Sequence, residues 1–412
     1  MATILAYTYP AAGHLFPLVP GLLELQARGH DVHLLAPGEH VGHVRAAGLD
    51  AQPMDERPEV AVKDYDGPKS QRLKNGLAHL MAHGEAERAE LERAIARVNP
   101  DLLIVDVNAY GAIVGAEASG RPWAMAIPSL LPWPGRGIPP YGLGMKPRHD
   151  ALGRLRDAVL MRMVLRMYGK AMLPRLNELR TQAGLAPYSS ALQQLAGADR
   201  VLVLTGEPLE YPRTDMPAHF RFCGAQVWDP PAAAPAWLDE PGDPWVLVTC
   251  STDYQRDERL AAVAVEALRD EPVRVIVTLA DAHGAAALPR AANVRVERFV
   301  PHGPVLERAA AVVCHGGMGI VQKAVAAAVP VVAVPFGRDQ PEVARRVVEA
   351  GAGVALPLKR LEPGRLREAV RTARARGAEA ALASARLRAA GGAHRFADAA
   401  EELADRVAVT ST

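Results

Sequence analysis

Short apolar runs alternate along the chain with longer stretches whose apolar residues recur at helical spacing. Each short run is typical of a buried β-strand, and each longer stretch is typical of an amphipathic helix. This alternation predicts parallel sheets with crossover helices on both faces. The expected strands are Ile4–Thr8, Val32–Ala36, Leu102–Asp106 and Trp123–Ile127 in the first half, then Val246–Cys250, Val273–Leu279, Val294–Phe299, Ala311–Cys314 and Val331–Val334 in the second.

The alternation is interrupted near residue 228, where a segment rich in proline and alanine predicts a linker. We therefore expect an α/β protein with two Rossmann-like domains whose parallel sheets face a cleft. The expected division is an N-terminal domain over residues 1–227, a linker over 228–244, a C-terminal domain over 245–390, and a last helix within 391–412 that can pack back on the N-terminal domain.

Two segments of the first half break the pattern. Residues 52–76 are polar and rich in Pro, Asp and Lys, which predicts an irregular excursion before a helix over residues 77–98. Residues 128–147 are rich in Pro and Gly, which predicts a long loop, and a helix bearing Met and Arg is expected after it over 152–179. Because long loops in a compact domain are usually functional, both segments are candidates to cover a ligand.

Composition narrows the class of protein. The chain has 412 residues, 47 Lys and Arg against 46 Asp and Glu, and a formal net charge of +1, which argues against binding nucleic acid through bulk charge. The apolar runs are too short for a membrane span, and the first residues lead into a strand rather than a secretory leader. Three widely spaced cysteines fit a reducing compartment. We expect a cytoplasmic protein, and the sequence leaves open whether it forms a homodimer.

The strongest chemical signal is the run Cys314-His315-Gly316-Gly317-Met318-Gly319, which follows an apolar strand and precedes a helix. Glycines let the backbone approach a ligand closely, and the start of a helix offers free N–H groups and partial positive charge. These are the requirements of a bound pyrophosphate, to which His315 can add a hydrogen bond. The alternative is a glycine-rich turn that only packs the helix on its sheet.

Asp339 and Gln340 follow the strand Val331–Val334, at the turn into the next helix. A carboxylate beside an amide can bind neighbouring hydroxyl groups of a sugar. Asp339 is equally suited to be the N-cap of that helix, and both roles can coexist.

His14 and Asp106 form a second candidate pair in the first half. His14 lies in the loop after the first strand, and Asp106 ends another strand of the same expected sheet. A carboxylate at that shared edge can orient the imidazole, which can then act as a general base. A histidine held by backbone groups at a helix start is the alternative. Asp64-Tyr65-Asp66 looks like a metal-binding pattern, but it lies in the polar excursion, so no metal is expected.

Together these residues resemble the family 1 glycosyltransferases of the GT-B fold, especially the actinobacterial enzymes that attach deoxysugars to antibiotic aglycones. The resemblance covers nearly the whole chain. It rests, in this order, on Gly13-His14 with Pro17, on Asp106, on Phe299-Val300-Pro301-His302, on His315-Gly316-Gly317-Met318-Gly319 and on Asp339-Gln340.

The resemblance implies a role for each of these residues. His14 is implied to be the general base that deprotonates the acceptor hydroxyl, and Asp106 to be its orienting partner. It also implies an inverting reaction without a metal or other cofactor, with a nucleoside diphosphate sugar and an aglycone as small-molecule partners. The implied donor contacts are Ser251, Phe299, Val300, His302, His315, Gly316, Gly317, Met318, Gly319, Asp339 and Gln340.

The acceptor is expected in the N-terminal half, under the two irregular segments and the helix bearing Met. Because methionine and loop surfaces repack easily, they suit a large apolar ligand such as a polyketide-like aglycone. The candidate acceptor contacts are Pro10, Leu15, Trp133, Tyr141, Met163 and Met167.

The chain also departs from the family pattern. Phe299, His302 and Lys323 stand where plant members have Trp, Gln and a Glu that grips the ribose hydroxyls, and Ile320 replaces a Ser or Thr. An ammonium cannot accept a hydrogen bond from a 2′-hydroxyl, which favours a thymidine diphosphate (TDP) sugar as donor. Two alternatives stay open. A nucleotide-sugar epimerase can have the same architecture, and the changes at Ile320 and Lys323 also fit a degenerate homologue that binds a ligand or a partner protein.

Overall fold

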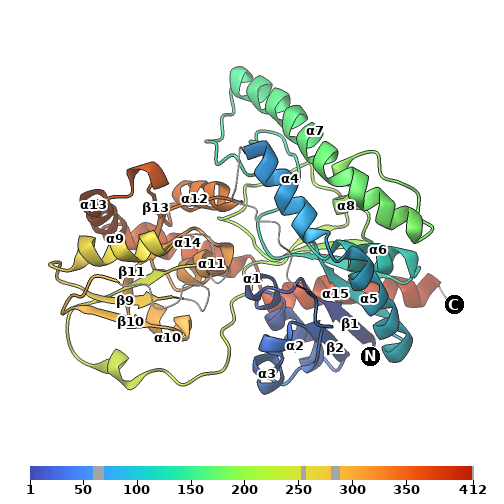
Figure 1. The fold of residues 1–412 in the computed structure, drawn as a ribbon, viewed down its shortest axis with the longest axis horizontal. Helices are drawn as coiled ribbons and strands as arrows, with labels where there is room; N and C mark the ends of the chain where they lie inside the picture. The colour runs from blue at the N-terminus through green and yellow to red at the C-terminus, as the bar shows by residue number, and fades with distance from the viewer. Residues whose placement is uncertain (59–68, 252–256, 280–287, 411–412) are drawn as a thin grey trace.

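The computed structural model describes residues 1–58, 69–251, 257–279 and 288–410, and it has two lobes, each built on a parallel sheet (Figure 1). The N-terminal sheet has seven strands in the order β3-β2-β1-β4-β5-β6-β7. Its strands are β1 (Thr3–Tyr7), β2 (Asp31–Ala36), β3 (Asp50–Pro53), β4 (Leu102–Asp106), β5 (Trp123–Ile127), β6 (Arg200–Val203) and β7 (Phe220–Phe222).

Helices cover both faces of this sheet. Successive side chains of a strand point to opposite faces, and here both sets are apolar and need to be buried. Ile4 and Ala6 pack in one core and Leu5 and Tyr7 in another. The helices of this lobe are α1 (Ala12–Leu15), α2 (Val19–Ala27), α3 (Gly38–Ala46), α4 (Lys69–Leu80), α5 (Gly84–Val98), α6 (Tyr110–Ala118), α7 (Ala151–Gln182) and α8 (Ala191–Ala196).

The C-terminal sheet has six strands in the order β10-β9-β8-β11-β12-β13. They are β8 (Trp245–Thr249), β9 (Arg274–Thr278), β10 (Val294–Glu297), β11 (Ala309–Cys314), β12 (Val331–Ala333) and β13 (Gly353–Ala355). The helices around it are α9 (Glu258–Leu268), α10 (His302–Leu306), α11 (Met318–Ala326), α12 (Gln340–Glu349), α13 (Pro363–Arg374) and α14 (Gly377–Ala389), with short 3-10 turns at Ala236–Asp239 and Leu358–Arg360.

The last helix, α15 (Ala393–Thr410), returns to the N-terminal lobe and packs on α2. The Phe396 ring lies so close to Gly21 that a Cβ added to that glycine would be 2.3 Å from a ring carbon. Arg28, just after α2, donates to Asp398 and Glu401 at 2.7 Å each. Helix α15 thus packs on the N-terminal lobe, although the C-terminal lobe comes directly before it in the chain.

The structure corrects some of the expected elements. The helix expected over residues 77–98 is two helices, α4 and α5, and α4 already begins at Lys69, inside the segment expected to be irregular. A Cβ added to Gly111 would lie 1.9 Å from the Gly84 carbonyl oxygen, so the close approach of α5 and α6 fixes where α5 starts. Strands β3, β6, β7 and β13 were not predicted, because three or four residues carry too little pattern.

Within the described residues, no helix combines the length and the apolar character that crossing a bilayer requires.

Candidate active site

His14 and Asp106 meet at the carboxyl edge of the N-terminal sheet. Strands β1 and β4 pair in parallel, with Tyr7 opposite Val105, so Asp106 and the α1 residues that follow β1 share one edge. The His14 Nδ1 atom lies 3.0 and 2.9 Å from the two Asp106 carboxylate oxygens. Asp106 is fully buried, whereas the His14 side chain is 22% exposed. The buried carboxylate therefore holds an imidazole that solvent and ligands can still reach.

This contact fixes the tautomer of His14. A carboxylate accepts a hydrogen bond from Nδ1–H, which leaves the lone pair on Nε2. Asn108 Nδ2 lies 3.3 Å from that Nε2, and the Asn108 backbone N–H donates to Asp106 Oδ1 at 2.8 Å. Nε2 is thus an acceptor of protons in the resting structure, as a general base requires.

Asn108 is a site residue that the sequence analysis missed. The available signal was its position two residues after Asp106, in the turn that leaves the same strand. Tyr9 was also missed, and its ring meets the His14 ring edge-on at 5.2 Å between centroids.

The glycine turn 315–317 lies at the carboxyl edge of the C-terminal sheet. Strand β11 ends at Cys314, which pairs with Thr249 of β8, so the turn and Ser251 leave the same edge. Gly316 has a φ of +89°, and Gly317 is the N-cap of α11. A Cβ added to Gly317 would lie 2.4 Å from His315 Nε2. The absence of a side chain at Gly317 thus makes room for the His315 imidazole beside the start of the helix.

Burial lowers the pKa of His315 below its ordinary value, although the Asp257 and Asp339 carboxylates act in the opposite direction. The ring is therefore neutral at neutral pH and can donate one N–H to an anion. Asp257 Oδ2 lies 3.8 Å from His315 Nδ1 and also accepts from the Ser251 backbone N–H at 2.6 Å. Asp257, which the sequence analysis did not single out, links the two loops.

Replacing Gly317 with alanine is expected to weaken binding of a nucleoside diphosphate at least tenfold. The added methyl group would displace the His315 ring and lift any diphosphate from the α11 N–H groups. Titration calorimetry with TDP measures the change. Gly364→Ala is the matched control, since Gly364 lies in α13, outside the implied donor contacts, and a Cβ there meets nothing within 4 Å. Equal affinity of both variants and the parent would show that the turn does not hold the diphosphate.

Asp339 and Gln340 are brought together with the loop 128–147. Asp339 occupies the N-cap position of α12, but its Oδ2 accepts from Ser129 Oγ at 2.7 Å and lies 3.5 Å from the Tyr141 hydroxyl. Gln340 Oε1 accepts from the backbone N–H groups of Phe336 and Gly337 at 2.7 and 3.1 Å. The Asp339 carboxylate thus faces the loop 128–147, and Gln340 shapes the turn before α12.

The loop 128–147 also contacts α12 further along that helix. Glu342 Oε2 accepts from the Gly144 N–H at 3.1 Å, and Arg345 Nε donates to the Gly144 carbonyl at 3.2 Å. A Cβ added to Gly144 would lie 2.4 Å from the Pro341 oxygen. Buried Arg346 pairs with Glu342 at 3.0 Å and with Glu210 of the N-terminal lobe at 3.4 Å. Helix α12 therefore carries several polar contacts between the lobes.

The expected nucleobase residues lie around the start of α10. Phe299 is 57% exposed, whereas Val300 is buried in the C-terminal core. Burial, followed by the charge of Lys323, lowers the pKa of His302 to about 4, so its ring is neutral. Lys323 Nζ lies 2.6 Å from Asp229 of the linker, whose other oxygen accepts from the Gly303 N–H at 2.9 Å. Asp229 was not expected from the sequence.

The structure does not gather the candidate acceptor contacts into one site. Leu15 is fully buried in the N-terminal core, which gives it a structural role, and Pro10 is exposed in the bend between β1 and α1. Trp133 packs edge-on against Phe220 at 5.0 Å. Tyr141 reaches Asp339, as described above. Met163 and Met167 lie on an exposed side of α7. Acceptor binding by these residues stays a prediction.

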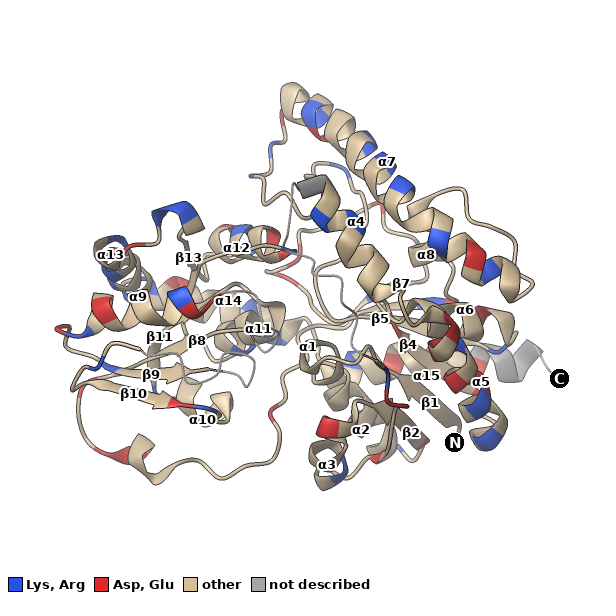
Figure 2. Cartoon of the chain, viewed as in Figure 1, with Lys and Arg blue, Asp and Glu red and all other residues tan. Residues whose placement is uncertain are grey.

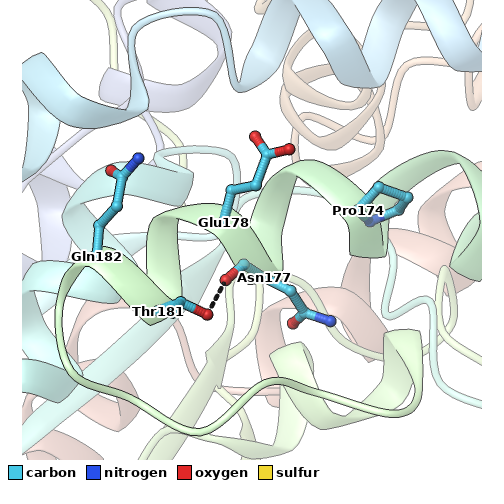
Figure 3. A pocket seen from close by; sticks show the side chains of 5 residues that line it. All are labelled: Pro174, Asn177, Glu178, Thr181 and Gln182. Atoms are coloured by element: carbon cyan, nitrogen blue, oxygen red, sulfur yellow. Dashed lines mark hydrogen bonds between the residues drawn. The ribbon is translucent and has the colours of Figure 1, made fainter.

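Figure 3 shows a hollow of about 460 Å³ on the C-terminal part of α7, lined by Pro174, Asn177, Glu178, Thr181 and Gln182. Thr181 Oγ1 donates to the Asn177 carbonyl, and the Asn177 amide binds the backbone of Tyr188. Its lining includes none of the residues that surround His14 or His315, and its polar groups serve the local fold.

The Asp64–Asp66 pattern lies outside the described residues. Across the ranges that are described, no three His, Cys, Asp or Glu side chains are grouped so as to hold a metal ion.

Comparisons with known proteins place the chain in a family. The model for the C-terminal domain of erythromycin biosynthesis protein CIII-like proteins matches residues 262–399. The 4'-demethylrebeccamycin synthase of Lentzea aerocolonigenes is 32% identical over 390 residues, or 90% of this chain and 91% of that protein.

Two solved structures confirm the expected GT-B fold. The glycosyltransferase of kitacinnamycin is 24% identical, with a TM-score of 0.76 over 98% of both chains. The glycosyltransferase VinC, crystallised with DTDP, is also 24% identical, with a TM-score of 0.72 over 98% of this chain and 100% of its own. This protein therefore belongs to the erythromycin biosynthesis protein CIII-like glycosyltransferases, the GT-B enzymes of antibiotic biosynthesis.

Proposed function

We propose that this glycosyltransferase is an inverting, metal-independent enzyme that moves a sugar, a deoxysugar in particular, from a TDP sugar to a hydroxyl group of a hydrophobic, polyketide-like aglycone in the cytoplasm. The observation that carries the proposal is the His14–Asp106 contact, with Nε2 left as the proton acceptor. A glycine turn at a helix start, beside a neutral histidine, supports binding of the diphosphate in the other lobe.

In this mechanism His14 Nε2 takes the proton of the acceptor hydroxyl while its oxygen attacks the anomeric carbon. The new carbon–oxygen bond forms on the face opposite the leaving group, and the old bond gives its electron pair to the departing diphosphate. Asp106 stabilises the imidazolium that results. The α11 N–H groups and the His315 N–H stabilise the charge on the diphosphate, which is the role that a metal plays in other enzymes.

The proposed preference for TDP rests on the ribose end of the donor. Lys323 is tied to Asp229 at 2.6 Å, so this corner presents a neutralised ion pair in place of the Glu found in plant members. The Lys323 charge and its hydrogen bond hold the pKa of Asp229 below its ordinary value against the effect of burial. A deoxyribose lacks the 2′-hydroxyl, so it loses no hydrogen bond where this ion pair replaces the Glu carboxylate.

TDP is expected to raise the melting temperature of the protein more than uridine diphosphate does at equal concentration. A ligand that binds only the folded state stabilises it by about 2.7 kcal/mol at a hundred times its Kd, so a tenfold difference in affinity is readily seen. Thermal-shift measurements with both nucleotides give the comparison.

The double variant D229N/K323E tests the role of this ion pair. It places a carboxylate at position 323, and the change at Asp229 removes the carboxylate that would otherwise lie beside it. This variant is expected to reduce the difference between the melting-temperature shifts that TDP and uridine diphosphate produce. A larger shift with uridine diphosphate in the parent would contradict the TDP assignment, and no shift with either nucleotide would contradict the donor site itself.

A further inference from the structure

The first half of α7 carries an unusual exposed stripe. Five apolar side chains at helical spacing are between 39 and 69% exposed; they are Leu152, Leu155, Val159, Met163 and Met167. We call these five residues the α7 stripe. With a rise of about 1.5 Å per residue, it runs for about 22 Å along one side of the helix. Isolated exposed apolar residues are ordinary, but a continuous row of them marks a binding surface.

The second half of the same helix behaves differently. There Met172, Leu176 and Leu179 are buried, and they pack with side chains of α4 and α6. The α7 stripe therefore does not continue the side of the helix that faces the core in its second half. In Figure 1 the N-terminal half of α7 reaches out beyond the rest of the N-terminal lobe, where a flat partner can approach it.

Positive charge is concentrated around the stripe. Between residues 146 and 170 the chain has seven Lys and Arg but only Asp150 and Asp157 as acids, although the whole chain has a net charge of only +1. Asp157 is buried and paired with Arg156, and Asp150 is paired with Arg148. Arg162, Arg166 and Lys170 are exposed beside the stripe, and Figure 2 shows more blue than red along α7.

We infer that the α7 stripe and its flanking cations form a docking surface for an anionic lipid bilayer. A helix that presents apolar side chains flanked by Lys and Arg inserts its apolar face between the headgroups, while the cations meet the lipid phosphates. The surface is a single convex helix rather than a groove, which suits a plane better than a folded protein. A second copy of this chain is disfavoured, since it would bring two cationic faces together.

The inference is independent of the proposed reaction, but it suits an enzyme whose acceptor is apolar. The loop 128–147, which contacts Asp339, leads through Asp150 into α7. Docking through the stripe would bring that loop close to the lipid surface, where apolar compounds accumulate.

Vesicle co-sedimentation of the whole protein tests the inference. Binding is expected to vesicles of phosphatidylglycerol and phosphatidylcholine, to be at least tenfold weaker to phosphatidylcholine alone, and to fall as salt rises from about 0.05 to 0.5 M. L155E/V159E is expected to abolish binding. L382E is the matched control, because Leu382 on α14 is 69% exposed, far from the stripe in the chain.

A second pair of variants tests the charges. R162Q/R166Q is expected to weaken binding to the anionic vesicles on the order of tenfold, since each cation near such a surface contributes about 1 kcal/mol. K359Q/R360Q removes two exposed cations from the other lobe and is expected to leave binding unchanged. Melting temperatures of all variants check that they are folded.

Several results would overturn the inference. They are failure of the parent to bind anionic vesicles at low salt, equal binding to neutral vesicles, and equal loss with L382E. A concentration-dependent dimer in light scattering that L155E/V159E disrupts, without vesicle binding, would assign the stripe to a second copy of the chain. The parent and L155E/V159E could also be retained equally on polyglutamate while the parent fails to bind vesicles. That result would assign the α7 stripe and its cations to an acidic partner.

Discussion

His14→Ala is expected to lower kcat for sugar transfer by a factor between about 10² and 10⁴, the usual contribution of a general base. The variant loses the Nε2 atom that is proposed to accept the acceptor proton, and Asp106 is too deeply buried to replace it. Initial rates with a saturating TDP sugar and an aglycone substrate measure the loss. Donor binding should survive, because the glycine turn lies in the other lobe.

Two comparisons make the His14 result specific. His43→Ala removes an exposed histidine of α3 and should leave kcat unchanged. Asp106→Asn keeps the shape of the side chain but no longer holds Nδ1–H, so its kcat should also fall steeply while the thermal shift with TDP stays the same. Full activity of His14→Ala would remove the histidine from the mechanism.

Arg346→Met is expected to destabilise the folded protein by about 3–5 kcal/mol. The substitution leaves Glu342 and Glu210 buried without their shared cation, and it also removes the guanidinium that lies 3.5 Å from the centre of the Tyr211 ring. Burial already raises the pKa of Glu210, and without Arg346 this carboxyl group is expected to bind a proton more readily still. The melting temperature should fall by on the order of 10 °C.

Arg365→Met supplies the control for that loss. Arg365 and Glu362 form an ion pair whose side chains are both more than half exposed, and such pairs contribute at most about 1 kcal/mol. Adding Glu210→Gln and Glu342→Gln to Arg346→Met should recover part of the stability, since no buried charge is then left unpaired. If Arg346→Met and Arg365→Met melt at the same temperature, the buried network does not hold the lobes together.

The architecture could be predicted from the sequence because its central strands are long and apolar. Leu102–Asp106 and Trp123–Ile127 were expected with the bounds that the structure shows, since every residue in them is buried. Strands such as β7 and β13 escaped prediction, because three residues at a sheet edge have no distinctive pattern. The break between α4 and α5 depends on how Gly84 meets Gly111, a tertiary contact that no local pattern encodes.

Within the candidate site, the sequence predicted some of the contacts between the proposed residues and missed others. Asp106 beside His14 followed from the shared edge of parallel strands. The contact of Asp339 with Ser129 joins residues 210 positions apart, and the ion pair of Lys323 with Asp229 joins residues of α11 and the linker. Such long-range pairs depend on how the two lobes sit together, which periodicity and spacing do not reveal.

The hydrogen bond between Ser129 and Asp339 ties a proposed donor contact to the loop 128–147. A sugar hydroxyl that binds Asp339 Oδ2 would share this oxygen with the Ser129 hydroxyl or displace it, because a carboxylate oxygen can accept more than one hydrogen bond. Under the proposed function, the affinity for the donor sugar is therefore expected to depend on the position of this loop.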